Sequence, residues 1–138
     1  MGNFETLVYS NGEWERYVKN DAWDRDRQTH PYIAFEIHDS DFAVVDYRPA
    51  TIGSGRFYLR LQPRDYFEDP KANPWVDIEA EASGLAAWAH SALGRTISSD
   101  DVREFVAPDK VDEPEDVFVE ETMERLLRQL GLGMPDVT

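Results

Sequence analysis

The chain carries three consecutive strand-like runs: Tyr32-Ile33-Ala34-Phe35-Glu36-Ile37-His38, then Phe42-Ala43-Val44-Val45-Asp46-Tyr47-Arg48, then Arg56-Phe57-Tyr58-Leu59-Arg60-Leu61-Gln62. Each run is rich in aromatic and β-branched residues and alternates with a period of two, which is the pattern of a half-buried β-strand. Because successive side chains of a strand point to opposite faces, the three runs predict a sheet with one apolar and one polar face.

The alternation also predicts how the first two strands pair. Their odd-numbered positions are apolar, whereas the even positions of the second run include Asp46 and Arg48. A shift of one residue would move a whole set of side chains to the wrong face, so odd positions must pair with odd positions. The three-residue loop Asp39-Ser40-Asp41 satisfies this condition. The predicted partners are Ile37 with Ala43, Phe35 with Val45, and Ile33 with Tyr47.

The second hairpin is predicted to turn through residues 49–55, where Gly53-Ser54-Gly55 supplies a permissive backbone. The same parity then pairs Tyr47 with Phe57 and Val45 with Leu59. On the polar face this register predicts three cross-strand rows, which hold Tyr32, Arg48 and Arg56, then Asp46 and Tyr58, then Glu36 and Arg60.

This polar face is the first candidate binding surface. Tyrosine and arginine are typical of binding hot spots, and adjacent arginines favour neutralisation by a carboxylate or a ligand. The long loop at residues 63–75 follows the sheet, and loops of this length are often functional. The candidate binding residues are Tyr32, Asp46, Arg48, Arg56, Tyr58, Arg60 and Tyr66. The alternative is a solvated face with arginine stems lying over the sheet.

The N-terminal segment allows two interpretations. Residues 4–9 predict a fourth strand, which Ser10-Asn11-Gly12 ends. Asn-Gly between apolar runs is a hairpin signal. However, Trp14, Tyr17 and Val18 have helical spacing, and on this basis we expect a helix from about residue 13 to residue 22.

Three helices are predicted in the second half of the chain. The first covers residues 77–93 and ends at Gly94, the second is short and capped by Ser98 or Ser99, and the third covers residues 114–130. The predicted order is therefore β-α-β-β-β-α-α-α. This is an α+β fold in which helices pack on one face of an antiparallel meander of three to four strands. We expect residues 1–138 to form one domain, with a frayed tail from about residue 133.

The composition of the chain, and above all its net charge, limits the kinds of molecule that we expect it to bind. The chain has 138 residues, no cysteine and a net charge of −14. Nucleic acid and anionic lipid both require a cationic surface, so we expect the protein to bind neither. The sequence shows no signal-peptide pattern and no apolar run of the ~20 residues that a membrane helix needs. These features predict a soluble, cytoplasmic protein.

No motif in the chain predicts catalysis. The three histidines, His30, His38 and His90, lack the spacing of metal ligands. Asp39 and Asp41 flank a tight turn, where aspartate is favoured for local hydrogen bonding. We therefore expect no metal and no cofactor, and we favour a non-enzymatic role.

The acidic residues gather towards the C-terminus, since residues 98–138 hold 12 acidic and 4 basic side chains. The candidate partner surface is made of Asp112, Glu113, Glu115, Asp116, Glu120 and Glu121. In size and acidic character the chain resembles the small immunity proteins of bacterial toxin systems, although no motif carries this resemblance. The leading hypothesis is an acidic intracellular module that binds and blocks a basic protein such as a toxin.

Two alternatives remain. One is a small-molecule binding protein or enzyme, with an anionic ligand between the polar sheet face and residues 63–75. The other is a homodimer that pairs through an exposed sheet edge.

Overall fold

Five strands precede three helices in the computed structural model, which describes residues 4–18, 28–60, 76–107 and 117–134. The strands are β1 (Phe4–Ser10), β2 (Glu13–Val18), β3 (Tyr32–His38), β4 (Phe42–Arg48) and β5 (Arg56–Leu59). The helices are α1 (Ile78–Leu93), α2 (Ser99–Arg103) and α3 (Val119–Leu130). The strands form one antiparallel sheet in the order β2-β1-β3-β4-β5.

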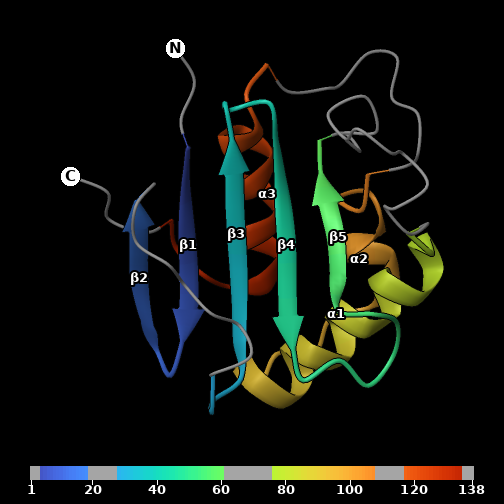
Figure 1. The fold of residues 1–138 in the computed structure, drawn as a ribbon. Coiled ribbons are helices and arrows are strands. Elements are labelled where there is room, and N and C mark those ends of the chain that lie inside the picture. Colours follow the sequence, from blue (N-terminus) through green and yellow to red (C-terminus); the bar gives the residue numbers. More distant parts are fainter. Residues whose placement is uncertain (1–3, 19–27, 61–75, 108–116, 135–138) are drawn as a thin grey trace.

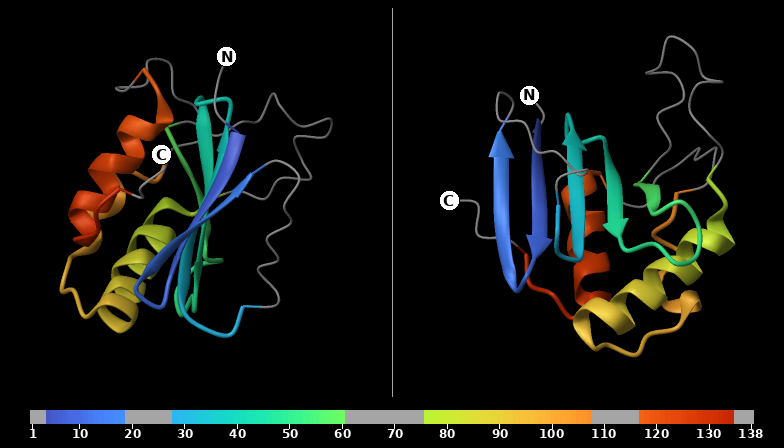
Figure 2. Two further views of the ribbon diagram at one scale, coloured as in Figure 1. Left: turned by 90° about the vertical axis from the view of Figure 1, so that its left-hand side faces the viewer. Right: turned by 60° about the horizontal axis from the view of Figure 1, so that its bottom comes forward.

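The three helices lie on the same side of the sheet (Figures 1 and 2). The odd-numbered side chains of β3 and β4 face the helices and are almost fully buried. Leu85 of α1, Val102 of α2 and Met123 of α3 complete the same core. The predicted α+β class and the predicted placement of the helices on one face are confirmed.

The prediction of a helix at residues 13–22 is wrong, because residues 13–18 form strand β2; residues 19–22 lie outside the described part of the chain. Asn11 and Gly12 both have positive φ, at 54° and 82°, as a two-residue hairpin turn requires. Trp14 lies opposite Tyr9 and its ring also contacts Phe35 of the core. The hairpin signal of Asn-Gly therefore overrides the helical spacing. Because β1 lies between β2 and β3, the sheet is not a simple meander.

The predicted β3–β4 register is confirmed at all three pairs, Ile37 with Ala43, Phe35 with Val45 and Ile33 with Tyr47. The predicted β4–β5 register has the right parity but is displaced by two residues. Val45 pairs with Phe57, and Ala43 pairs with Leu59. The ladder begins at Asp46 and Arg56, and Tyr58 lies opposite Val44, so none of the three predicted rows forms as a whole: Tyr32 with Arg48 and Arg56, Asp46 with Tyr58, or Glu36 with Arg60. Strand β5 is also shorter than the predicted run of residues 56–62, because it ends at Leu59. The next residue, Arg60, has a positive φ of 71°.

The helix boundaries follow local capping chemistry. Asp77 caps α1 by accepting a hydrogen bond from the Ala80 N–H at 3.0 Å, and Gly94 ends the helix in the left-handed conformation. Ser98 precedes α2 as predicted. The start predicted for the last helix is too early, because Val117 and Phe118 lie outside α3; residues 114–116 are outside the described residues.

Helix α1 approaches the β4–β5 connection closely at Gly84. A Cβ atom at this position would lie 2.2 Å from the Ile52 carbonyl oxygen and 2.3 Å from the Tyr47 hydroxyl oxygen. Four residues later, the Trp88 indole N–H donates to the Arg48 carbonyl at 2.8 Å. The helix is therefore held against the end of β4, with no space for a side chain at residue 84.

Replacing Gly84→Ala tests this close approach. Alanine normally favours a helix over glycine by about 1 kcal/mol. Here we expect the steric conflict to win and the free energy of unfolding to fall by about 1–3 kcal/mol, measured by urea denaturation. Gly133→Ala is the matched control, because a Cβ atom there meets nothing within 4 Å. An increase in stability for Gly84→Ala would show that α1 does not pack this closely.

Candidate functional site

The outer face of the sheet, opposite the helices, is much less exposed than a solvated face. Tyr32, Asp46 and Tyr58 are only 1%, 4% and 3% exposed. Tyr32 packs with Val8 and Ala34, whereas Tyr58 packs with Phe42, with ring centroids 6.5 Å apart. These three predicted binding residues therefore contribute to packing in the structure.

The predicted arginines on this side are engaged within the chain. Arg56 holds Asp46 through two hydrogen bonds, at 2.8 Å from Nε and 3.2 Å from Nη2. Arg60 donates to the Asp41 carboxylate at 2.7 Å. Arg48 donates to the Ser54 carbonyl at 2.8 Å. The sequence identified a face rich in arginine, and the structure shows that its charges stabilise the hairpins.

Tyr66 and the rest of the 63–75 loop lie outside the described residues. The predicted ligand site between this loop and the sheet therefore stays a prediction. Of the candidate acidic partner residues, Asp112, Glu113, Glu115 and Asp116 also lie outside the described residues, and Glu120 and Glu121 lie in the first turn of α3.

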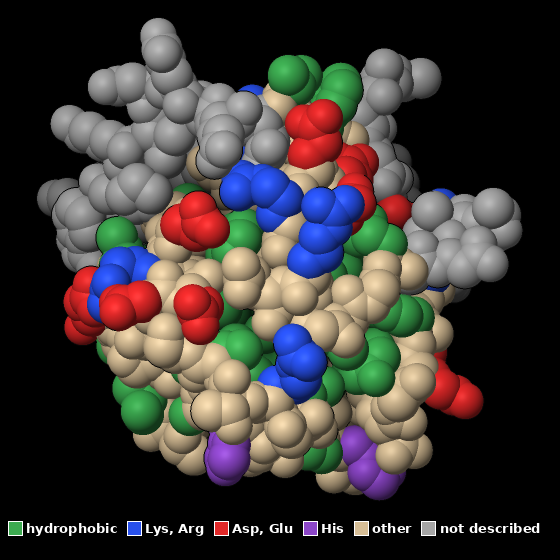
Figure 3. Space-filling model, turned by 180° about the vertical axis from the view of Figure 1, so that it is seen from behind, with side chains coloured by type: hydrophobic (Ala, Val, Ile, Leu, Met, Phe, Trp, Pro, Cys, Tyr) green, Lys and Arg blue, Asp and Glu red, His purple; other side chains and the backbone are tan. Residues whose placement is uncertain are grey.

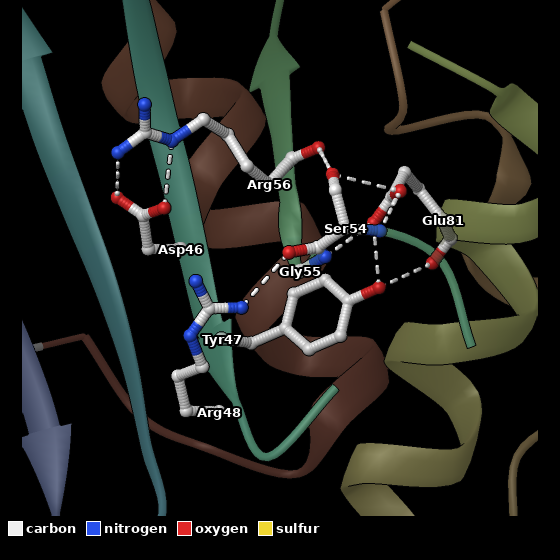
Figure 4. A network of polar contacts seen from close by, with 7 residues as sticks. All are labelled: Asp46, Tyr47, Arg48, Ser54, Gly55, Arg56 and Glu81. Atoms are coloured by element: carbon white, nitrogen blue, oxygen red, sulfur yellow. Dashed lines mark hydrogen bonds and ion pairs between the residues drawn. The ribbon is translucent and has the colours of Figure 1, made fainter. Parts of the chain in front are cut away.

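A buried polar network that the sequence did not reveal lies between α1 and the β4–β5 connection (Figure 4). The Glu81 carboxylate is at its centre, in a residue that is 2% exposed. Its Oε1 accepts from the Tyr47 hydroxyl at 2.7 Å and from the Gly55 N–H at 3.1 Å. Its Oε2 accepts from Ser54, from the N–H at 2.7 Å and the hydroxyl at 3.1 Å. Four donors thus satisfy one buried carboxylate.

This network anchors the β4–β5 connection to helix α1. Burial, and then the hydrogen bond to Glu81, raise the pKa of the Tyr47 hydroxyl far above its ordinary range. Tyr47 therefore stays protonated as a donor, and the lone pairs of Glu81 are occupied by the chain itself. A general acid or base must instead reach a substrate proton. We assign Glu81 and Tyr47 to holding the hairpin on α1.

A different kind of surface lies where α3 begins. Val117 and Phe118 are adjacent in sequence and are 69% and 54% exposed. The described residues contain two other exposed large hydrophobic side chains, Ile52 and Met134, at 44% and 41%. We call Asp39, Val117, Phe118, Glu120 and Glu121 the α3-start surface.

The β3–β4 turn and the start of α3 are joined by two hydrogen bonds. The Val119 N–H donates to the Ser40 carbonyl at 2.9 Å, and the Ser40 hydroxyl donates to Glu120 at 2.8 Å. These bonds place Asp39, the exposed neighbour of Ser40, at the same end of the molecule as Val117 and Phe118. Figure 1 shows the turn and the start of α3 together at this end.

The two glutamates of the α3-start surface also stabilise the N-terminus of α3. Glu121 accepts from the N–H groups of Val117 and Phe118, at 3.0 and 3.1 Å. Both glutamates lie at the positive end of the helix dipole, which stabilises them there. Glu121 is exposed next to the two apolar side chains, whereas Glu120 is half-buried, with Oε1 inaccessible and Oε2 bonded to Ser40.

Figure 3 views the helix side, where hydrophobic side chains project at the end from which α3 starts, with carboxylates beside them. Basic side chains lie further along this side. Arg128 pairs with Glu124 at 2.6 Å, and Arg103 pairs with Glu79 at 2.7 Å. Apolar and acidic side chains thus lie together at this end of the molecule, where Arg60 also pairs with Asp41.

The residues 4–18, 28–60, 76–107 and 117–134 contain no cluster of three or more histidine, aspartate or glutamate side chains that could hold a metal ion. Within these ranges, no helix is long and apolar enough to cross a membrane. No protein-family model, curated protein or solved structure matches the chain. A function must therefore be proposed from the surfaces themselves.

Replacing Glu81→Gln tests the anchor. The amide has one acceptor oxygen in place of two, so buried donors on Tyr47, Ser54 or Gly55 lose their partner. We expect the free energy of unfolding to fall by about 1–3 kcal/mol in urea denaturation. Glu79→Gln is the matched control on the same helix, because its side chain is 68% exposed and its surface ion pair contributes under about 1 kcal/mol. Equal losses in the two variants would contradict the anchor.

The raised pKa of Tyr47 predicts a loss of stability in alkali. An unfolded tyrosine ionises near pH 10 while the folded Tyr47 keeps its proton, so the unfolded state binds fewer protons above that pH. Stability must then fall as pH rises above about 10, by up to about 1.4 kcal/mol per pH unit from this group. We expect Tyr47→Phe to show a shallower fall than the original protein in denaturation at pH 9–11. Parallel curves would refute the assignment.

Proposed function

We propose that the protein is a non-enzymatic interaction module of the immunity or inhibitor type, which binds and blocks a basic protein such as a toxin. The α3-start surface is the docking site. The observation that carries this proposal is the pair Val117 and Phe118, which expose 69% and 54% of their surface beside Glu120 and Glu121.

Folding of α3 gives no reason for these two apolar residues. Phe118 occupies the N-cap position, where serine, threonine, aspartate and asparagine are preferred because their oxygen accepts from the first helical N–H groups. An apolar residue before the cap can pack on the first turn as a hydrophobic staple. Val117 is too exposed to do so. Adjacent exposed apolar side chains with an acidic border are typical of a contact that a partner covers.

Charge indicates the kind of partner. The chain has a net charge of −14, and the α3-start surface presents the exposed carboxylates of Asp39 and Glu121 near its apolar pair. A basic partner would be steered to this end, whereas an acidic protein would be repelled. The partner best suited to the surface has an apolar pocket or side chain surrounded by lysine and arginine.

The alternative, an anionic small molecule on the polar sheet face, has less support. An anionic ligand site needs cationic side chains that are available to bind the ligand. Arg48, Arg56 and Arg60 instead donate to acceptors within the chain, and Arg56 does so in a two-bond pair with a buried aspartate. Removing an arginine from such a pair to bind a ligand would leave Asp46 buried without its cation, which is costly.

The test combines capture with two variants. The protein would be immobilised at low salt and exposed to lysate of its native host, and the retained protein identified by mass spectrometry. We expect a basic protein to bind one-to-one. The double variant Val117→Ser with Phe118→Ser should lose about 2 kcal/mol or more of binding free energy, as hot-spot residues do. Ile52→Ser is the matched control, an exposed hydrophobic residue away from this surface.

Salt gives a second readout on the purified complex. Affinity should fall roughly tenfold between about 50 and 500 mM salt, because exposed charge pairs are screened. A retained protein that is acidic, that binds independently of salt, or that binds the double variant as tightly as the original protein would overturn the proposal. So would a homodimer that buries Val117 and Phe118, as measured by sedimentation of the original and double-variant proteins.

A further inference from the structure

A pocket of about 350 Å³ lies at the opposite end of the sheet from the α3-start surface. Its walls come from three parts of the chain: the β1–β2 turn, residues 30–31 before β3, and the last turns of α1. The β1–β2 turn and the start of β3 lie together at the lower end of the sheet in Figure 1. Because these segments are far apart in sequence, the pocket exists only in the folded protein.

The described part of the pocket lining contains no carboxylate, ammonium or guanidinium group. Among the nine lining residues that the structure describes, none is aspartate, glutamate, lysine or arginine, although these four types make up 30% of the chain. Trp88, Ala92 and Leu93 of α1 form an apolar wall, and Tyr9 adds an aromatic ring. An ion would lose its hydration here without gaining an opposite charge, so the lining favours an uncharged ligand.

The aromatic groups of the lining are held in place. The ring of Tyr9 meets Trp14 edge to face, with centroids 5.3 Å apart, and the Trp88 indole is oriented by its hydrogen bond to the Arg48 carbonyl at 2.8 Å. Ser10 donates to the Pro31 carbonyl at 3.0 Å, which ties the turn to the start of β3. Trp88 is only 2% exposed, so the planar surface open to a ligand comes mainly from the partly buried Tyr9 ring. Because this ring is already ordered, it favours a flat, aromatic ligand at little cost in side-chain entropy.

Hydrogen bonding at the rim favours a donor on the ligand. Ala92 and Leu93 belong to the last turn of α1, where the final carbonyl groups of a helix have no partner within the helix and carry partial negative charge. A ligand N–H could bond to such a carbonyl. His30 is exposed at the rim and offers a further polar contact.

We propose that this pocket binds a small, uncharged, bicyclic aromatic molecule that carries an N–H donor. The pocket volume exceeds the ~150 Å³ of a cavity that holds benzene and lies at the lower end of ordinary ligand sites. The site is separate from the α3-start surface, so binding here does not depend on the proposed partner. It gives the protein a second, small-molecule function.

Indole is the probe for this site, measured by titration of the ¹⁵N-labelled full chain with amide shifts as the readout. We expect saturable shifts at Ser10, Gly12, His30 and Leu93, with a dissociation constant below about 1 mM. Benzofuran, which has the same shape without the N–H, and indole-3-acetate, which adds a carboxylate, should each bind at least about tenfold more weakly.

Two pairs of variants separate binding from folding. Ala92→Phe fills the pocket from α1 and should abolish the shifts, whereas Ser91→Phe changes its exposed neighbour and should leave them. His30→Trp fills the rim from a loop, with Thr29→Trp as its control, so the test remains decisive if Ala92→Phe does not fold. Circular dichroism would verify the fold of each variant.

Three results would overturn the proposal: no saturable shift with about 5 mM indole, equal binding of indole-3-acetate, or undiminished binding to folded His30→Trp. A fourth is tenfold tighter binding of N-acetyl-tryptophanamide than of indole, which would assign the pocket to a tryptophan side chain of a protein partner. None of these outcomes bears on the α3-start surface, whose test uses different residues and a different probe.

Discussion

The buried Glu81 carboxylate joins the two layers of the molecule. This carboxylate on α1 accepts four hydrogen bonds, from the Tyr47 hydroxyl at the end of β4, from the N–H and the hydroxyl of Ser54, and from the Gly55 N–H before β5. The close approach requires glycine on both sides, since a Cβ atom on Gly53 would lie 2.5 Å from Glu81 Oε2 and Gly84 has no space for one. A buried carboxylate without these donors would be strongly destabilising, so the hairpin and the helix must form their contact together.

The period-two pattern was sufficient to predict the central register. In β3 and β4 the odd-numbered positions are all apolar, whereas the charged residues are all at even-numbered positions, so a shift by one residue would bury Asp46 in the core. The amphipathic stripes and caps of α1 and α3 were equally informative, because Gly94 and Gly131 stand where a left-handed residue must end each helix. Local chemistry repeated over many positions therefore predicted most of the fold.

Contacts between distant residues were not predictable in this way. Parity allowed β5 to pair at two positions separated by two residues. In the structure Asp46 lies opposite Arg56 and is paired with it, while Glu81 holds Ser54 and Gly55 in the connection just before β5. Strand β2 was not predicted because its helix-facing side carries both an apolar residue, Trp14, and a charged residue, Arg16. Trp14 packs inward, while Arg16 reaches over the sheet to the buried Glu5. The spacing of Trp14, Tyr17 and Val18 suggested a helix, and nothing in that spacing indicates that Arg16 pairs with Glu5.

The same distinction explains why the most conspicuous polar residues in the sequence are poor evidence for a binding site. The arginines on the outer sheet face donate hydrogen bonds to aspartate and to a backbone carbonyl, and Tyr58 packs against a neighbouring ring. These side chains therefore stabilise the fold. Val117 and Phe118 were predicted to lie inside a helix, but α3 begins at Val119 and both side chains are exposed. The walls of the neutral pocket come together only through the β1–β2 hairpin that the helical spacing had obscured. The surfaces proposed for binding in this protein therefore depend on element boundaries and strand registers, which are the features that sequence patterns determine least well.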